Sequence, residues 1–91
     1  MKQEDKVKKA VALRYEENED PAPQVVASGR GPVAERIIET AQKSGVPIHR
    51  DPDLAEMLST LDIGTQIPPE LYQVVAEVLV FIYSLDQKAP K

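Results

Sequence analysis

The hydrophobic and polar positions of this chain first follow a strand-like pattern and later a helical one. The stretch from Val7 to Tyr15 is nearly continuously apolar from Ala10 onward, as in a strand that is covered on both faces. A second short run, Gln24–Ser28, follows an acidic segment at residues 16–23 that holds two prolines, which cannot continue a strand ladder. These patterns predict an antiparallel β-hairpin with a long acidic turn.

The next segment predicts a helix followed by a strand. Gly29-Arg30-Gly31-Pro32 ends the second strand, and proline suits the first position of a helix. Apolar residues then recur at helical spacing and predict a buried face made of Val33, Ile37, Ile38 and Ala41. Gly45 is a natural helix terminator. We predict a short third strand at Val46–His49, parallel to the second because such crossovers are right-handed.

Two further helices complete the pattern. Asp51 is a good N-cap with Pro52 at the first helical position, and the expected buried face consists of Leu54, Ala55, Leu58 and Leu61. After a bend at Gly64, Pro68-Pro69 opens a last helix that runs from Glu70 to about Leu85. The predicted fold class is α/β: a small mixed three-stranded sheet packed with three helices, in the order β-β-α-β-α-α. We expect a single domain at residues 7–86, with flexible ends at residues 1–6 and 87–91.

Two features of this predicted fold are candidates for contact with partners. The last helix is apolar over more than half of its circumference, although a helix on the outside of a sheet needs only one apolar face. Packing on the sheet therefore does not account for the apolar residues Val80, Phe81 and Tyr83. Either neighbouring helices cover these residues or they form a patch for a partner. The first strand is the second candidate, because at a sheet edge its backbone could pair with a strand from another chain.

The composition excludes several classes of function. The net charge of −4 argues against binding to nucleic acid, because such binding is favoured by a concentrated positive surface. The absence of cysteine removes disulfide and thiolate chemistry and fits a reducing compartment. The longest apolar stretch, residues 74–85, is shorter than the ~20 residues of a membrane span, and the N-terminus lacks the apolar core of a signal peptide. We therefore expect a cytoplasmic protein without direct membrane insertion.

The sequence offers no set of residues typical of an enzyme. His49 is the only histidine, the carboxylates lack metal-ligand spacing, and no serine lies in a G-x-S-x-G context. Gly29-Arg30-Gly31 precedes a helix and could hold an anion, but it lacks the phosphate-loop lysine, so a strand-to-helix turn explains it better. We predict no catalytic residue, no metal and no cofactor; binding of a small molecule or anion at residues 29–32 and His49 is the weakest alternative.

Three segments of the chain together resemble one known family. They are AVALRYEENEDPAPQVVASG (residues 10–29), AERIIETAQKSGVPIHRDPDLAEML (34–58) and IGTQIPPELYQVVAEVLVFIYSL (63–85). Their order and spacing are similar to those of the cytoplasmic C-terminal domain of the FlhB/YscU family (FlhB/HrpN/YscU/SpaS) of flagellar and type III secretion proteins. The resemblance covers about Val7 to Leu85 and implies the fold of that export-switch domain.

This chain differs from the family at the motif that directs self-cleavage of family members. Family members carry Asn-Pro-Thr-His just before the first strand, and the asparagine side chain attacks its own carbonyl and splits the chain. The corresponding residues here are Asp5, Lys6, Val7 and Lys8, and the only asparagine, Asn18, does not precede a proline. The family's large membrane-spanning region is also missing. The resemblance therefore implies a stand-alone homologue of the cleaved C-terminal fragment, without autocleavage.

The resemblance also implies a place where partners bind. In the family, export substrates dock in an apolar pocket between the Pro-containing turn and the last helix, and the matching positions are Ala22, Pro23, Ala76 and Leu79. Together with Val80, Phe81 and Tyr83 they are the candidate partner-binding residues. The expected partners are exported substrate proteins or the membrane protein of the export apparatus, met at the export gate on the inner membrane. Two alternatives stay open: plain packing of the turn onto the helix, and an export-independent adaptor or homodimer with the same fold.

Overall fold

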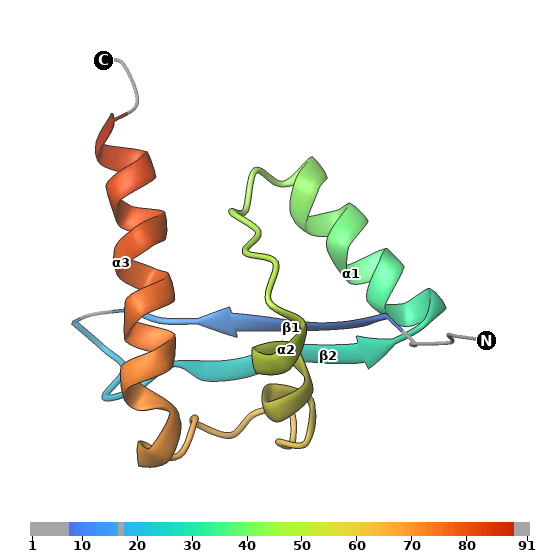
Figure 1. The fold of residues 1–91 in the computed structure, drawn as a ribbon, viewed down its shortest axis with the longest axis horizontal. Coiled ribbons are helices and arrows are strands. Elements are labelled where there is room, and N and C mark those ends of the chain that lie inside the picture. The colour runs from blue at the N-terminus through green and yellow to red at the C-terminus, as the bar shows by residue number, and fades with distance from the viewer. Residues whose placement is uncertain (1–7, 17, 89–91) are drawn as a thin grey trace.

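The computed structural model describes residues 8–16 and 18–88 (Figure 1). In chain order the elements are strands β1 (Lys9–Arg14) and β2 (Gln24–Arg30), helices α1 (Pro32–Lys43) and α2 (Pro52–Ser59), the short 3₁₀ helix η1 (Pro69–Leu71) and helix α3 (Tyr72–Lys88). The predicted α/β class is confirmed, with its hairpin and three helices in the expected order. Of the ends expected to be flexible, residues 1–6 and 89–91 lie outside the described residues, whereas residues 87 and 88 belong to helix α3.

The predicted third strand at residues 46–49 is wrong, and so is the mixed sheet that depended on it. Within the described chain the sheet has two strands, β1 and β2, paired antiparallel. Helix α1 ends in a Schellman motif: Gly45 has a φ of 74°, and the Val46 N–H donates to the Ala41 carbonyl at 2.9 Å. Residues 46–49 form no regular element: Pro47 has no N–H, and no described strand lies beside this segment to form a ladder.

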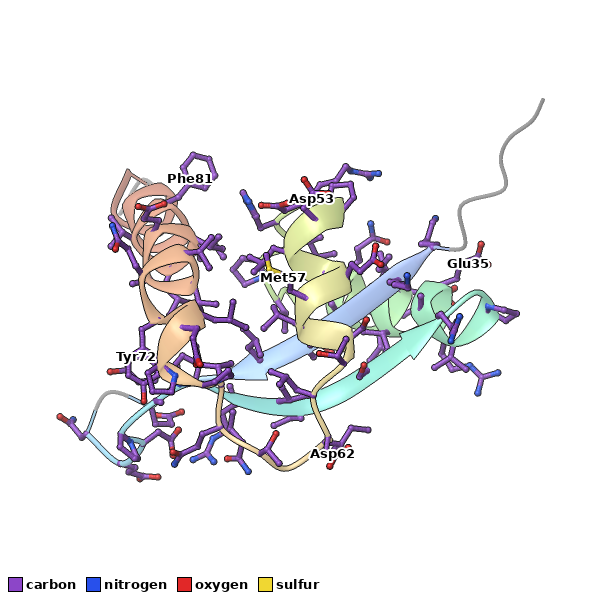
Figure 2. The ribbon with its side chains drawn as sticks, turned by 60° about the horizontal axis from the view of Figure 1, so that its bottom comes forward. Glu35, Asp53, Met57, Asp62, Tyr72 and Phe81 are labelled. Carbon is purple, nitrogen blue, oxygen red and sulfur yellow. The ribbon has the colours of Figure 1, made fainter. Side chains whose placement is uncertain are left out.

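The two helices that follow this segment cover one face of the sheet. Figure 2 shows α2 and α3 next to each other above the strands. Their buried core consists of Leu54, Leu58, Ile67 and Val75, with Val11 and Leu13 of β1 packed against it. Because side chains alternate along a strand, Ala12 points to the opposite face, where it lies near α1. The sheet is therefore the middle layer between α1 and the α2–α3 pair.

Local sequence signals predicted where the helices start more accurately than they predicted which helix faces are buried. The Asp51 carboxylate accepts a hydrogen bond from the Leu54 N–H at 3.1 Å, so the predicted cap of α2 is confirmed. In α1, however, Val33 is 54% exposed, whereas Ala34 is 0% exposed. The predicted burial of Val33 is thus wrong, because the turn at Gly31 (φ 60°) brings the small Ala34 side chain against the sheet instead.

The last helix is longer than its sequence signals indicated. Helix α3 continues to Lys88, past the expected end near Leu85, and begins after the 3₁₀ turn at Pro69–Leu71. Its N-terminal part packs on the core through Val75, while its C-terminal part extends beyond the sheet (Figure 1). Within residues 8–16 and 18–88, no helix has both the length and the apolar character that crossing a membrane requires.

Candidate partner-binding pocket

A pocket of about 190 Å³ lies between the β1–β2 turn and helix α3. It is lined by Tyr15, Pro21, Ala22, Pro23, Tyr72, Ala76 and Leu79. The structure thus brings together the four positions to which the resemblance pointed, two from the turn and two from the helix, although about fifty residues separate them in the sequence. That this pocket binds a partner stays a prediction.

The turn side of the pocket is fixed by hydrogen bonds at both of its ends. At the first end, the Glu16 N–H donates to Asp20 Oδ2 at 2.9 Å, and the Asp20 N–H donates to the Glu16 carbonyl at 2.7 Å. Arg14 lies 3.2 Å from a carboxylate oxygen of Glu19 and 3.9 Å from one of Asp20. At the second end, the Pro23 carbonyl accepts a hydrogen bond from the Ile67 N–H at 2.9 Å. Pro21–Pro23 is therefore held in place as a wall.

The helix side of the pocket is a stripe on the first half of α3. Tyr72, Ala76 and Leu79 recur at i, i+4 and i+7, which places them on one face of the helix. Val75 on the adjoining face is almost completely buried and anchors the helix in the core. Because Ala76 has the smallest side chain of the stripe and is itself exposed, the pocket is open at this position.

The lining of the pocket suits an apolar side chain. The described lining residues are aliphatic or aromatic, and the polar groups of their side chains are the hydroxyls of Tyr15 and Tyr72. A cavity of ~150 Å³ in another protein accepts benzene, so the volume of about 190 Å³ has room for an aromatic or branched aliphatic side chain. Elsewhere too, the described residues contain no cluster of three or more His, Cys, Asp or Glu side chains that could hold a metal ion.

Three of the candidate residues lie outside this pocket. Val80 and Phe81 are well exposed, and neither is among the lining residues. The Phe81 ring instead meets His49 edge-on, with ring centroids 6.1 Å apart. His49 in turn lies 4.0 Å from a carboxylate oxygen of Asp51. The side chain of Tyr83 falls outside the described part of the structure, and so do Asp5, Lys6 and Val7, three of the four positions that the resemblance aligns with the cleavage motif. The fourth, Lys8, is exposed.

The sequence did not identify three of the lining residues: Tyr15, Pro21 and Tyr72. One signal for Tyr72 was available, since it precedes Ala76 by one helical turn and Leu79 by two. Tyr15 and Pro21 carry no comparable signal, because their position depends on how the turn folds back over α3.

Comparisons with known proteins identify a single family. The family described as "FlhB HrpN YscU SpaS Family" matches residues 7–82. The uncharacterized protein YlqH of Bacillus subtilis is 49% identical over 87 residues, which cover 96% of this chain and 94% of YlqH. Flagellar biosynthetic protein FlhB of Escherichia coli is 48% identical over 77 residues, 84% of this chain but 20% of FlhB. The crystal structure of the PscU C-terminal domain superposes with a TM-score of 0.79 at 30% identity, covering 82% of this chain and 96% of that one.

Proposed function

Because this chain belongs to the FlhB/HrpN/YscU/SpaS family, we propose that it is a non-enzymatic protein-binding module of a flagellar or type III export apparatus. In this proposal its pocket holds an apolar side chain of an exported protein, on the cytoplasmic side of the inner membrane. One observation carries the proposal: Ala22, Pro23, Ala76 and Leu79 converge on a single open apolar pocket. A membrane protein of the export gate is the other partner in this proposal, and it would present the module to its substrates.

The surroundings of the pocket favour a polypeptide as the ligand. Val80 follows Leu79 on α3 and is well exposed, so apolar surface continues from the pocket along the helix. A small metabolite would gain little from such an extended surface, whereas a peptide segment can place one side chain in the pocket and the next along α3. The described residues of the pocket lining carry no charge, which also disfavours a phosphorylated or carboxylated small molecule.

The test of this function is export in cells that lack the chromosomal copy of the gene. We expect Ala76→Asp to reduce the amount of exported protein in the culture medium by about tenfold relative to wild-type complementation, because a partner would bury the new carboxylate in an apolar site. Ala76 is exposed, so the substitution should not disturb folding.

Gln73→Asp is the matched control, since it adds the same charge to an exposed position of α3 outside the pocket lining. It should export like the wild type. Unchanged export both in the deletion strain and with Ala76→Asp would refute the proposed function.

The proposal also includes the absence of self-cleavage. We expect the purified chain to keep its full mass of 10.1 kDa during prolonged incubation at neutral pH. The physical reason is that Asp5-Lys6 offers neither the side-chain amide nor the following proline of the family motif. Intact-mass spectrometry checks this, with a variant that carries Asn-Pro-Thr-His at positions 5–8 as the positive control. Loss of residues 1–5 from the unmodified chain would show that this part of the proposal is wrong.

A second function, an export-independent homodimer, is favoured by the exposure of Val80 and Phe81. In this alternative the two residues would lie at the centre of a dimer interface. Light scattering after size exclusion separates the two functions: the export module is expected to be a monomer at micromolar concentration, and a stable dimer would favour the alternative.

A further inference from the structure

Along the outer edge of strand β1, no residue among 8–16 and 18–88 pairs with the backbone of the strand. The Gly31 N–H donates to the Lys8 carbonyl at 2.8 Å, and the register pairs Ala10 with Gly29 and Ala12 with Ala27. Backbone groups alternate in direction along an antiparallel strand, so the N–H and C=O groups of Lys9, Val11 and Leu13 point away from β2. No hydrogen bond joins any of these groups to a described residue.

The outer edge of β2 differs, because the connector before α3 closes part of it. The Val25 N–H donates to the Thr65 carbonyl at 2.8 Å, and the Val25 carbonyl accepts from the Gly64 N–H at 2.7 Å. An isolated antiparallel bridge joins Gln24 to Gln66 beside these bonds. In the part of the chain that the structure describes, β1 is therefore the edge that presents a full run of unpaired backbone groups to another strand.

An apolar groove lies beside this open edge. It measures about 380 Å³ between the sheet and α1, and its lining includes Ala12, Ala27, Val33, Ile37, Ala41 and Val46. Val33 and Val46 are both more than half exposed there. In a strand added next to β1, side chains level with Ala12 would point to the same face as Ala12, toward this groove.

We propose that the β1 edge and the α1 groove together bind an extended segment of another protein by strand addition. Its backbone pairs with Lys9, Val11 and Leu13, and one of its apolar side chains enters the groove. Lys8 is exposed at the start of β1 and favours a segment with a carboxylate at the neighbouring end, whereas the Lys9 ammonium already lies 3.8 Å from a Glu56 carboxylate oxygen. The surface is separate from the pocket against α3, so this proposal does not rest on the function proposed above.

The charges of β1 disfavour pairing of its edge with the β1 strand of a second copy of this chain. Antiparallel pairing of two β1 strands about Val11 would set Lys8 opposite Arg14 of the other copy, twice in each dimer. Like charges directly opposite each other destabilise a strand pair, and lysines on an edge strand are a common protection against self-pairing. A heterologous acidic segment meets no such penalty.

Amide hydrogen exchange of the ¹⁵N-labelled chain tests the proposal. The probe is the end-blocked peptide Asp-Val-Thr-Val-Thr-Val-Asp, with the same peptide carrying Lys at both ends as its control. We expect the acidic peptide to slow exchange of the Lys9, Val11 and Leu13 amides by at least about tenfold, because these N–H groups become hydrogen-bonded. Exchange at Ala10 and Ala12 should change little, and the Lys-ended peptide should have a weaker effect.

Two variants of Lys9 distinguish the contribution of backbone pairing to peptide affinity from the contribution of the lysine charge. Lys9→Pro removes an N–H that does not face β2, so the hairpin ladder stays intact, and it should raise the Kd of the acidic peptide by about tenfold. Lys9→Ala removes the same charge but keeps the N–H, and it should raise the Kd much less. Circular dichroism checks that both variants fold.

Three outcomes would overturn the proposal. They are unchanged exchange at the three amides, an equal Kd for both Lys9 variants, and concentration-dependent protection of the free chain, which would mean self-pairing. The Ala76→Asp variant is expected to bind this peptide like the wild type. Failure of strand addition is therefore distinguishable from failure of the pocket.

Discussion

Replacing Leu58 with alanine is expected to lower the free energy of unfolding by about 2–5 kcal/mol. Leu58 lies in the core between α2, the connector and α3, in contact with the cluster of Leu54, Ile67 and Val75. A domain of 91 residues has a total stability of roughly 5–14 kcal/mol, so this loss is a large fraction of the whole. Urea unfolding followed by circular dichroism measures it through the shift of the midpoint.

Met57 provides the matched control on the same helix. Leu58 is 5% exposed, whereas the adjacent Met57 is 43% exposed. Met57→Ala should therefore change the unfolding free energy by less than about 1 kcal/mol. Equal losses for the two variants would contradict the assignment of the core to the α2 face that carries Leu54 and Leu58.

The second large effect is expected at Gly29, near the end of β2. A Cβ atom at this position would overlap the side chain of Val33 at the start of α1 and lie 2.8 Å from its Cβ. Gly29→Ala should therefore cost about 1–3 kcal/mol through overpacking. The clash includes the base of the side chain, which rotation of Val33 cannot move away. Thermal and urea unfolding give the cost.

A double-mutant cycle with Val33→Ala identifies the cause of that loss. Removing the Val33 methyl groups takes away part of the overlap, so Gly29→Ala should cost less in the Val33→Ala background. The two substitutions would then couple by more than about 0.5 kcal/mol. A neutral effect of Gly29→Ala in the wild type would show that α1 does not approach β2 this closely.

The elements that could be predicted from the sequence are those with local signals. Pro32 and the Asp51-Pro52 pair fix the starts of α1 and α2, because capping and proline geometry depend on adjacent residues only. The third strand could not be predicted in this way. The residues at 46–49 have a strand-like composition, but a strand exists only where a neighbour supplies hydrogen bonds.

The candidate site was predictable in part, and only through the family resemblance. Ala22 and Ala76 carry no chemical signal of their own, since the side chain of alanine is a single methyl group. What distinguishes them is that the turn and α3 face each other, and this arrangement depends on the Asp20 hydrogen bonds and the Pro23–Ile67 bond. Tyr15 and Tyr72 join the pocket for the same tertiary reason.

The central claim, that the pocket between the turn and α3 binds exported proteins, is tested most directly by NMR titration. The ¹⁵N-labelled chain is titrated with peptides that tile an exported protein of its host. We predict that one peptide shifts the amide signals of Ala22, Ala76 and Leu79, that Ala76→Asp abolishes these shifts, and that Gln73→Asp preserves them. The absence of shifts with every peptide, or shifts that centre on Val80 and Phe81 and persist in Ala76→Asp, would contradict the claim.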